Sequence, residues 1–86
     1  MYTLKYRRQA RNYLARLPYR TKLGIVKKLH ELAENPNNPR LDVKALKAEN
    51  AYRLRTGQFR VVYTLRHEEL IIEIVRVRPR GDVYKG

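Results

Sequence analysis

The side chains best suited to chemistry are arginines that alternate through residues 52–63, YRLRTGQFRVVY. Two runs rich in β-branched and aromatic residues flank Gly57-Gln58, and glycine at the first position of a two-residue turn predicts a type II′ β-hairpin. Counting outward from that turn pairs Arg55 with Arg60 and leaves Arg53 on the same side of the sheet. The pattern therefore predicts three arginines on one sheet face.

Like charges that face each other across a hairpin are destabilising, so this cluster needs an explanation. One explanation is a solvated face, whose charges are screened by water and salt. The other is a phosphate site, because the planar guanidinium group donates a fork of hydrogen bonds that matches phosphate oxygens. The hairpin alone leaves both explanations open.

The residue types around the cluster narrow the chemistry that it could perform. There is no carboxylate pair, no serine or cysteine nucleophile with a histidine base, and no glycine-rich phosphate loop. Acyl transfer, glycoside hydrolysis and nucleotide-driven reactions therefore lack their usual groups. Cleavage of RNA by its own 2′-hydroxyl stays possible, because arginines can stabilise the charge that develops on the phosphate. A basic surface that binds nucleic acid without catalysis fits equally well.

Composition indicates a small folded protein. The chain has 86 residues, of which 43% are hydrophobic, enough for one domain over residues 1–86 with a modest core. It has no cysteine, and its two histidines are predicted to be a partly buried structural residue (His30) and an exposed turn residue (His67), so we expect neither a metal nor a cofactor. No apolar run approaches the ~20 residues of a membrane span, and an apolar secretory segment is missing. We therefore expect a cytoplasmic protein with no membrane partner.

Charge is the strongest compositional signal. Twenty Lys and Arg residues against eight Asp and Glu residues give a net charge of +12 and a pI of about 10.5. Residues 1–30 contain nine basic side chains and no acidic one. Such a positive electrostatic field favours binding of a polyanion, above all nucleic acid. A membrane surface is disfavoured because the basic residues are not confined to one amphipathic helix, whereas an acidic protein partner is equally compatible.

Periodicity and turn residues predict the elements that hold the cluster. Residues 2–6 are typical of a short strand, and apolar positions three and four apart predict helices over 8–17 and 18–34 that pack antiparallel. After a loop at 35–40, residues 41–50 are expected to form a turn or a short irregular edge. The remaining strands are the two arms of the hairpin, the second over 59–65, and a nearly apolar run over 70–77.

These elements predict an α+β fold. A two-helix antiparallel hairpin packs on one face of a small, mostly antiparallel four-stranded sheet, in the chain order strand, helix, helix, strand, strand, strand. If the last two strands turn at RHEE, Glu73 faces Val62 and would pair with Arg60 or Arg53. In the same register Val77 faces Gln58, so the tail begins beside the central turn. This brings three side chains within reach of the cluster, namely Arg78, Arg80 and Tyr84.

The order of these elements, the stretch LDVKALKAENAYRLRTGQFRVVY and the closing RPRGDVY resemble the RelE toxins of the RelE/ParE superfamily over essentially the whole chain. The resemblance implies a type II toxin that acts on the ribosome, cleaves mRNA in the A site and is neutralised by a cognate antitoxin that wraps it. We expect the antitoxin to carry an acidic, amphipathic segment, and operator DNA to be contacted only through it. By the resemblance, the catalytic residues are Arg53, Arg55, Arg60, Arg80 and Tyr84, while the basic residues assigned to substrate binding are Lys44, Lys47, Arg76 and Arg78.

Two features depart from the RelE pattern. Pro79 stands where histidine often precedes the arginine after the last strand, and arginines stand where some members have lysines on the hairpin. Arginine cannot give up a proton near neutral pH, so the role of general base would fall on Tyr84 or on the substrate and ribosome. Arg78 and Arg80 compete for one catalytic position, and we favour Arg80 because it follows the strand by the usual interval.

Two other functions remain open. ParE-like members share the scaffold and the YRLR hairpin but poison DNA gyrase without cleaving RNA. They generally lack a basic tail that ends in tyrosine, so Tyr84 favours the RelE branch. In the third interpretation, the basic face only binds RNA or an antitoxin and catalyses nothing.

Overall fold

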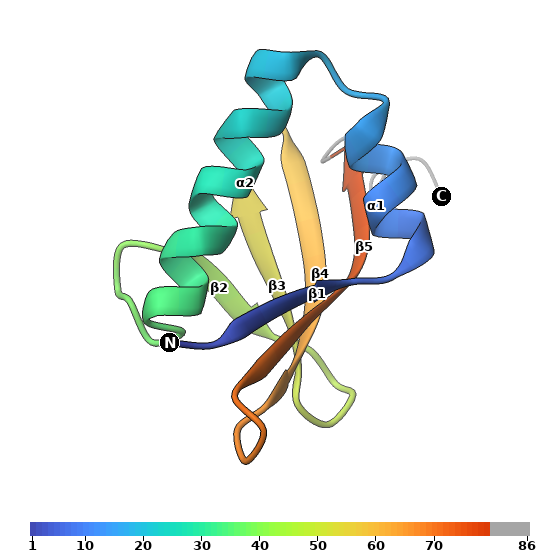
Figure 1. Cartoon of the computed structure of the whole chain (residues 1–86). Coiled ribbons are helices and arrows are strands. Elements are labelled where there is room, and N and C mark those ends of the chain that lie inside the picture. Colours follow the sequence, from blue (N-terminus) through green and yellow to red (C-terminus); the bar gives the residue numbers. More distant parts are fainter. Residues whose placement is uncertain (80–86) are drawn as a thin grey trace.

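The computed structural model describes residues 1–79 of the chain (Figure 1). Its elements, in chain order, are β1 (Thr3–Tyr6), α1 (Arg8–Ala15), α2 (Tyr19–Glu34), β2 (Asp42–Ala45), β3 (Ala51–Thr56), β4 (Phe59–Arg66) and β5 (Ile71–Pro79). The five strands form one sheet in the order β1-β5-β4-β3-β2, in which only β1 and β5 are parallel neighbours. The predicted α+β class is confirmed. The prediction of four strands was wrong by one, because residues 42–45 pair with β3 as an edge strand.

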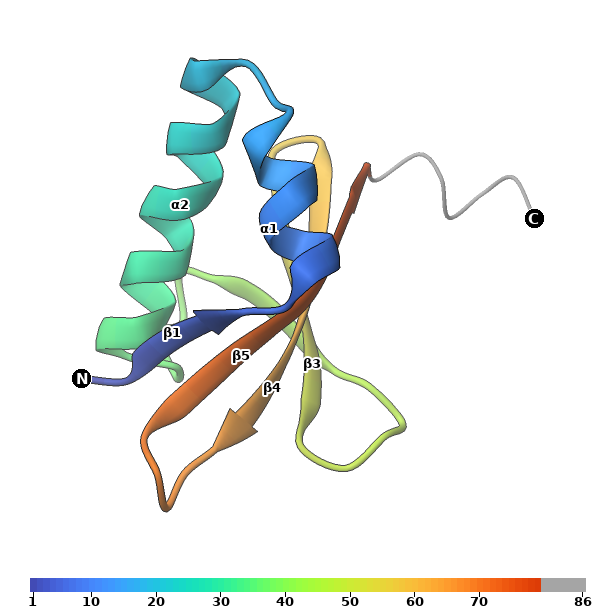
Figure 2. The same ribbon diagram turned by 45° about the vertical axis from the view of Figure 1, so that its right-hand side comes forward.

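Both helices cover the same face of the sheet and run antiparallel to each other, as predicted (Figures 1 and 2). Their buried residues recur at helical spacing, and they are Ala10 and Leu14 on α1 and Ile25, Leu29, Leu32 and Ala33 on α2. They pack on the alternate strand residues that face them, a core that includes Leu54, Val61, Tyr63, Ile72, Ile74 and Val77. Neither helix covers the opposite face, which we call the open face.

The β3–β4 hairpin has the predicted register. Gly57 adopts φ 57° in the turn, a left-handed conformation that suits glycine because it has no Cβ. Arg55 pairs with Arg60, and Arg53 pairs with Val62. Because a two-residue turn fixes the pairing on both sides of it, local sequence alone was sufficient here.

The β4–β5 hairpin differs from its prediction. β4 continues to Arg66, which pairs with Ile71, and residues 67–70 form the turn, with Leu70 at φ 55°. The turn has the predicted length but lies one residue later in the sequence, which displaces the pairing by two residues, so Glu73 pairs with Thr64 rather than with Val62. A displacement of two leaves each side chain on its predicted face but moves it along the sheet.

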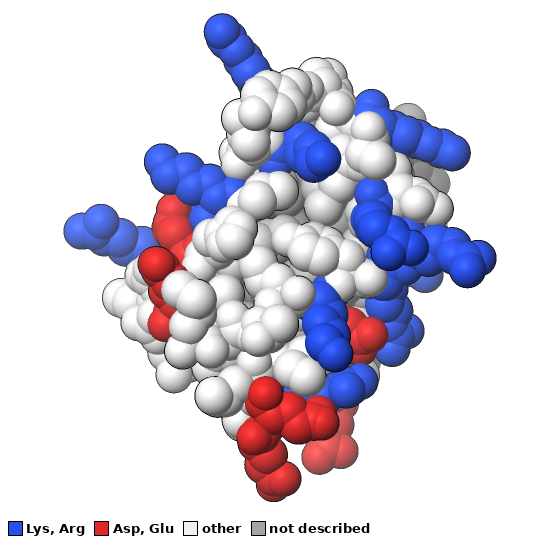
Figure 3. All heavy atoms as spheres, in the orientation of Figure 1, with Lys and Arg blue, Asp and Glu red and all other residues white. Residues whose placement is uncertain are grey.

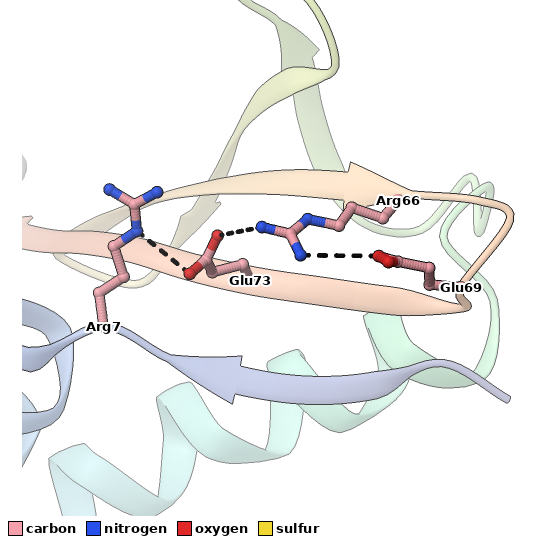
Figure 4. A network of polar contacts seen from close by, with 4 residues as sticks. All are labelled: Arg7, Arg66, Glu69 and Glu73. Carbon is pink, nitrogen blue, oxygen red and sulfur yellow. Dashed lines mark hydrogen bonds and ion pairs between the residues drawn. The ribbon is translucent and has the colours of Figure 1, made fainter.

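Glu73 consequently has other partners than those predicted. Its Oε2 accepts a hydrogen bond from Arg7 Nε at 3.2 Å, and its Oε1 lies 3.4 Å from Arg66 Nη2. Arg66 Nη1 also lies 3.6 Å from Glu69 Oε1 (Figure 4). The predicted ion pair with a hairpin arginine was wrong because Glu73 lies opposite Thr64, two residues further along β4 from the arginine cluster than predicted. The network instead joins β4, β5 and the residue that follows β1.

The two histidines have different environments. His30 is exposed on α2, so the prediction of a partly buried residue was wrong. The buried positions of α2 lie on either side of it in sequence, and it lines a hollow together with residues of β1. His67 is exposed in the β4–β5 turn as predicted, with its Nδ1 2.8 Å from the Tyr2 hydroxyl.

Tyr63 gives the fold an expected sensitivity to alkali. It is 1% exposed, its ring stacks on Tyr52 with centroids 5.6 Å apart, and burial, followed by the charge of Tyr52, raises the pKa of its hydroxyl. Because the folded state binds this proton more tightly, its contribution to stability is complete below about pH 10 and falls by up to about 1.4 kcal/mol per pH unit above it. Tyr63→Phe should therefore lose less stability in alkali, as measured by urea unfolding from neutral to alkaline pH. Tyr19→Phe, at an exposed tyrosine, should behave like the unmutated protein, and parallel curves for all three proteins would contradict the assignment.

Candidate nucleic-acid interface

Two adjacent rows of paired residues place basic side chains on the open face. Directly paired residues in neighbouring strands share a face of the sheet. One row runs across β2, β3, β4 and β5 through Asp42, Arg55, Arg60 and Arg78, and the next runs through Lys44, Arg53, Val62 and Arg76. We call these two rows the arginine rows. Six of their eight residues are basic, one is acidic and one is apolar.

A β-bulge in β5 brings Arg76 and Arg78 into the arginine rows. Tyr63 pairs with Ile74, whereas the preceding residue of β4 pairs with Arg76, so Val75 is an extra residue. Without it, Arg76 would face the helices, because a one-residue shift exchanges the two faces of a strand. The shifted turn and the bulge together make Val77 pair with Val61, so the predicted pairing of Val77 with Gln58 was wrong.

Gln9 on α1 holds the end of β5 beyond this bulge. Its Oε1 accepts a hydrogen bond from the Val77 backbone nitrogen at 3.2 Å, and its Nε2 donates one to the Val77 carbonyl at 3.4 Å. β1 pairs only with residues 71–74, so it does not reach this part of the strand edge. The Gln9 amide therefore satisfies a backbone segment that would otherwise lack partners and fixes the strand that carries Arg76 and Arg78.

The three hairpin arginines are partly or fully removed from solvent. Arg53 is 8% exposed, and Arg55 and Arg60 are half-buried. The Nε atom of each is buried and has no hydrogen-bond partner within residues 1–79. A buried donor without a partner is costly, so a small shift of the side chain that let a phosphate oxygen reach one of these N–H groups would be favourable.

Charge along the first arginine row is poorly balanced. Arg60 pairs directly with Arg55 on one side and with Arg78 on the other, and it forms no ion pair with any residue of 1–79. Asp42, at the β2 end of the row, lies 3.8 Å from Arg55 and 3.5 Å from Arg53. Three neighbouring cations with one carboxylate favour the approach of an anion.

The structure brings most of the proposed site residues together. Arg53, Arg55, Arg60, Arg76, Arg78 and Lys44 share the open face, and Lys47 lies in the β2–β3 connection outside the paired rows. Arg80 and Tyr84 lie outside the described residues. Sequence reasoning missed Asp42, because residues 41–50 were not recognised as a strand. The alternation of charged and apolar residues in DVKA was the available signal.

The helix side has a different character (Figure 3). Lysine and arginine side chains project around its rim, its centre is largely uncharged, and many acidic side chains gather toward the β4–β5 turn. A hollow of about 280 Å³ is lined by α1, α2 and β1 residues, namely Tyr6, Arg11, Leu14, Ala15, Lys22 and Val26. Neither α1 nor α2, the helices of residues 1–79, has the length and hydropathy needed to span a bilayer.

Taken together, the fold and the arginine rows define a small basic α+β protein whose open face suits a phosphate-bearing polyanion. Comparison with known proteins identifies the family. The model of the ParE toxin of the type II toxin–antitoxin system parDE matches residues 4–84. An Escherichia coli protein described as a RelE-like toxin is 34% identical over 85 residues, which cover 96% of this chain and 90% of that protein. The chain belongs to the RelE/ParE superfamily of toxins of type II toxin–antitoxin systems.

Solved structures of RelE toxins have the same fold. The archaeal RelE–RelB complex from Pyrococcus horikoshii OT3 matches with a TM-score of 0.81 and 27% identity over 93% of this chain and 96% of that chain. The RelBE2 complex of Mycobacterium tuberculosis matches with a TM-score of 0.77 and 28% identity over 92% and 98%. The isolated Escherichia coli RelE toxin, at 23% identity and a TM-score of 0.79 over 98% and 92%, supports the fold alone.

Proposed function

We propose that this toxin is a ribosome-dependent endoribonuclease that cleaves mRNA in the ribosomal A site and thereby inhibits translation. The observation that carries the proposal is the pair of arginine rows on the open face, with the buried and unpartnered Nε atoms of Arg53, Arg55 and Arg60. Donors that the fold holds in place before the substrate arrives stabilise developing charge without reorganising during the reaction. The 34% identity to a RelE-like toxin supports the same branch.

In the proposed reaction, the mRNA supplies its own nucleophile. A 2′-hydroxyl attacks the adjacent phosphorus, the bond to the 5′-oxygen of the next nucleotide breaks, and a 2′,3′-cyclic phosphate and a 5′-hydroxyl remain. Arg53, Arg55 and Arg60, together with Arg80, stabilise the pentacoordinate phosphate, and the ribosome aligns the strand. Arg76, Arg78, Lys44 and Lys47 bind the neighbouring phosphates. Tyr84 transfers a proton or stacks on a base, and the parts played by Arg80 and Tyr84 rest on the sequence.

A second candidate function is inhibition of DNA gyrase without RNA cleavage. The family model that matches residues 4–84 is that of the ParE toxin, which favours this candidate. A third candidate is a basic module that binds RNA or an antitoxin without catalysis. The basic open face is consistent with all three candidate functions, so only the molecule on which the toxin acts distinguishes them.

One experiment separates the three functions. The purified toxin is added to a reconstituted translation system with a defined mRNA, and in parallel to DNA gyrase with supercoiled DNA. Cuts confined to the A-site codon, and absent without ribosomes, are the expected result. Trapped gyrase–DNA complexes with intact mRNA would establish the second function. Inactivity in both assays, with RNA or antitoxin binding retained, would establish the third.

We also infer that a cognate antitoxin neutralises this toxin in the cytoplasm. The toxin would contact operator DNA only through this antitoxin. The RelE toxins from Pyrococcus horikoshii and Mycobacterium tuberculosis were solved as complexes with antitoxins. The net charge of +12 suits an acidic segment, and the apolar hollow between the helices suits the apolar face of an amphipathic one.

Association of toxin and antitoxin should therefore depend strongly on salt. Raising the ionic strength from about 0.1 M to about 1 M shortens the Debye length from about 10 Å to about 3 Å. The association rate should fall by about tenfold or more, and the dissociation rate should change much less, because apolar contacts hold the formed complex. Stopped-flow association and chase dissociation at several salt concentrations measure both rates. An association rate that is independent of salt would contradict the role of charge.

A further inference from the structure

Asp42 is the only acidic residue of the arginine rows. It pairs directly with Arg55 across β2 and β3 and lies diagonally from Arg53. The two oxygens of its carboxylate contact different guanidinium groups. Oδ1 lies 3.5 Å from Arg53 Nη2, and Oδ2 lies 3.8 Å from Arg55 Nη1. One carboxylate on the edge strand β2 thus contacts both Arg53 and Arg55, two of the cations proposed to bind the phosphate.

The burial of the three side chains is unequal. The Arg53 side chain is 10% exposed and that of Arg55 is 31% exposed, whereas the Asp42 side chain is 56% exposed. A guanidinium group as buried as that of Arg53 is strongly disfavoured without a counter-charge. Asp42 is the only carboxylate within ion-pair distance of it in residues 1–79. The buried cation therefore depends on the exposed anion for its orientation.

The contacts with Asp42 leave part of each guanidinium group without a hydrogen-bond partner. Asp42 engages one terminal nitrogen of Arg53 and one of Arg55, and the Nε atoms of both remain unpartnered. Arg55 also faces Arg60 directly, so attraction toward β2 draws its charge away from that neighbour. Contacts of 3.5 and 3.8 Å are longer than those of a tight bidentate pair, so an incoming phosphate does not have to break a strong bond.

We propose that Asp42 is a positioning residue, which holds the guanidinium groups of Arg53 and Arg55 toward the β2 edge in the orientation in which they meet a substrate phosphate. The proposal rests on the function proposed above for the choice of substrate. Asp42 touches neither the phosphate nor the reacting hydroxyl, and it acts only through the two arginines. Loss of its carboxylate should impair the chemical step more than binding.

The first test compares Asp42→Asn with Glu49→Gln in single-turnover cleavage on programmed ribosomes. Glu49 is exposed in the β2–β3 connection and forms no ion pair within residues 1–79, so its substitution changes the net charge equally without affecting the arginines. We expect Asp42→Asn to lower the rate at saturating ribosome by about 10- to 100-fold, with ribosome affinity unchanged or tighter. Glu49→Gln should retain the full rate. If Asp42→Asn cleaves as fast as Glu49→Gln, the proposal is overturned.

The second test does not depend on RNA cleavage. In ¹H–¹⁵N NMR spectra of Asp42→Asn, the Nε–H signals of Arg53 and Arg55 should move toward the chemical shifts of a solvated arginine. The Nε–H signal of Arg60 should keep its chemical shift. If the unmutated protein does not cleave mRNA, the proposed function fails and these signals alone decide the role of Asp42. Signals like those of the unmutated protein would overturn it.

Asp42→Glu keeps the charge but moves the carboxylate by one methylene. It should cleave at an intermediate rate, because placement as well as charge matters. Melting temperatures are measured alongside, and if Asp42→Asn does not fold, Asp42→Glu carries the test. If Asp42→Glu then cleaves at the rate of the unmutated protein and gives the same arginine signals, the positioning role of Asp42 is refuted.

Discussion

Replacing Arg60 with alanine should slow mRNA cleavage on the ribosome by about 10²- to 10³-fold, the usual cost of losing one preorganised donor, without lowering the free energy of unfolding. Arg60 lies between Arg55 and Arg78 in its row and has no ion pair within residues 1–79. Its Nε is buried without a partner. Removal of the side chain therefore relieves like-charge repulsion and an unsatisfied donor, while the phosphate loses a donor at the centre of the row.

Single-turnover cleavage and thermal unfolding measure the two effects separately. The matched control is Arg20→Ala, which removes the same charge from an exposed position of α2. The control should cleave at nearly the unmutated rate, because it alters the long-range field but not the arginine rows. A rate for Arg60→Ala equal to that of the control would remove Arg60 from the catalytic residues. A large drop in melting temperature would instead assign it a structural role.

Tyr84→Phe should have the second large effect. If the Tyr84 hydroxyl transfers a proton, its loss should slow the cleavage step by about 10²- to 10⁴-fold, the usual contribution of general acid–base catalysis. If Tyr84 only stacks on a base, the phenylalanine variant should retain most of the rate and Tyr84→Ala should lose it. The residue lies outside the described part of the chain, so melting temperatures of both variants are measured beside that of the unmutated protein.

The measurement is the same single-turnover assay on both Tyr84 variants, with ribosome affinity determined in parallel. Tyr19→Phe, at a tyrosine that is 73% exposed on α2, controls for a general effect of losing a phenolic hydroxyl. Near-normal rates in both Tyr84 variants would exclude the residue from the site. That result would also favour gyrase inhibition or simple binding, since the tyrosine of the tail is what separates the RelE branch from the ParE branch in the sequence.

The sequence by itself determined the features that depend on short-range rules. Gly57 fixes a two-residue turn, and the turn fixes which residues of β3 and β4 are opposite each other. Period-two alternation then places Arg53, Arg55 and Arg60 on one face without reference to any other element. Helical periodicity predicted α1, α2 and the face that they bury for the same reason, since the spacing of buried residues is set within each segment.

Only the tertiary structure decided which side chains surround that hairpin. The β4–β5 turn extends over residues 67–70, and the extra residue Val75 reverses the alternation of β5 so that Arg76 joins the open face. Neither feature has a strong local signal. The bulge allows Ile74 and Val77 to be buried together while Gln9 holds the strand edge. Packing against residues far apart in sequence therefore determines this register.

The position of Asp42 was decided in the same way. Residues 42–45 form a strand because the exposed edge of β3 supplies hydrogen-bond partners, and not because their sequence strongly prefers an extended conformation. Pairing with β3 then places the carboxylate against Arg53 and Arg55. The alternating pattern shows which residues share a face. Their neighbours on that face are determined by the assembled sheet, because pairing between distant segments depends on the core that they bury together.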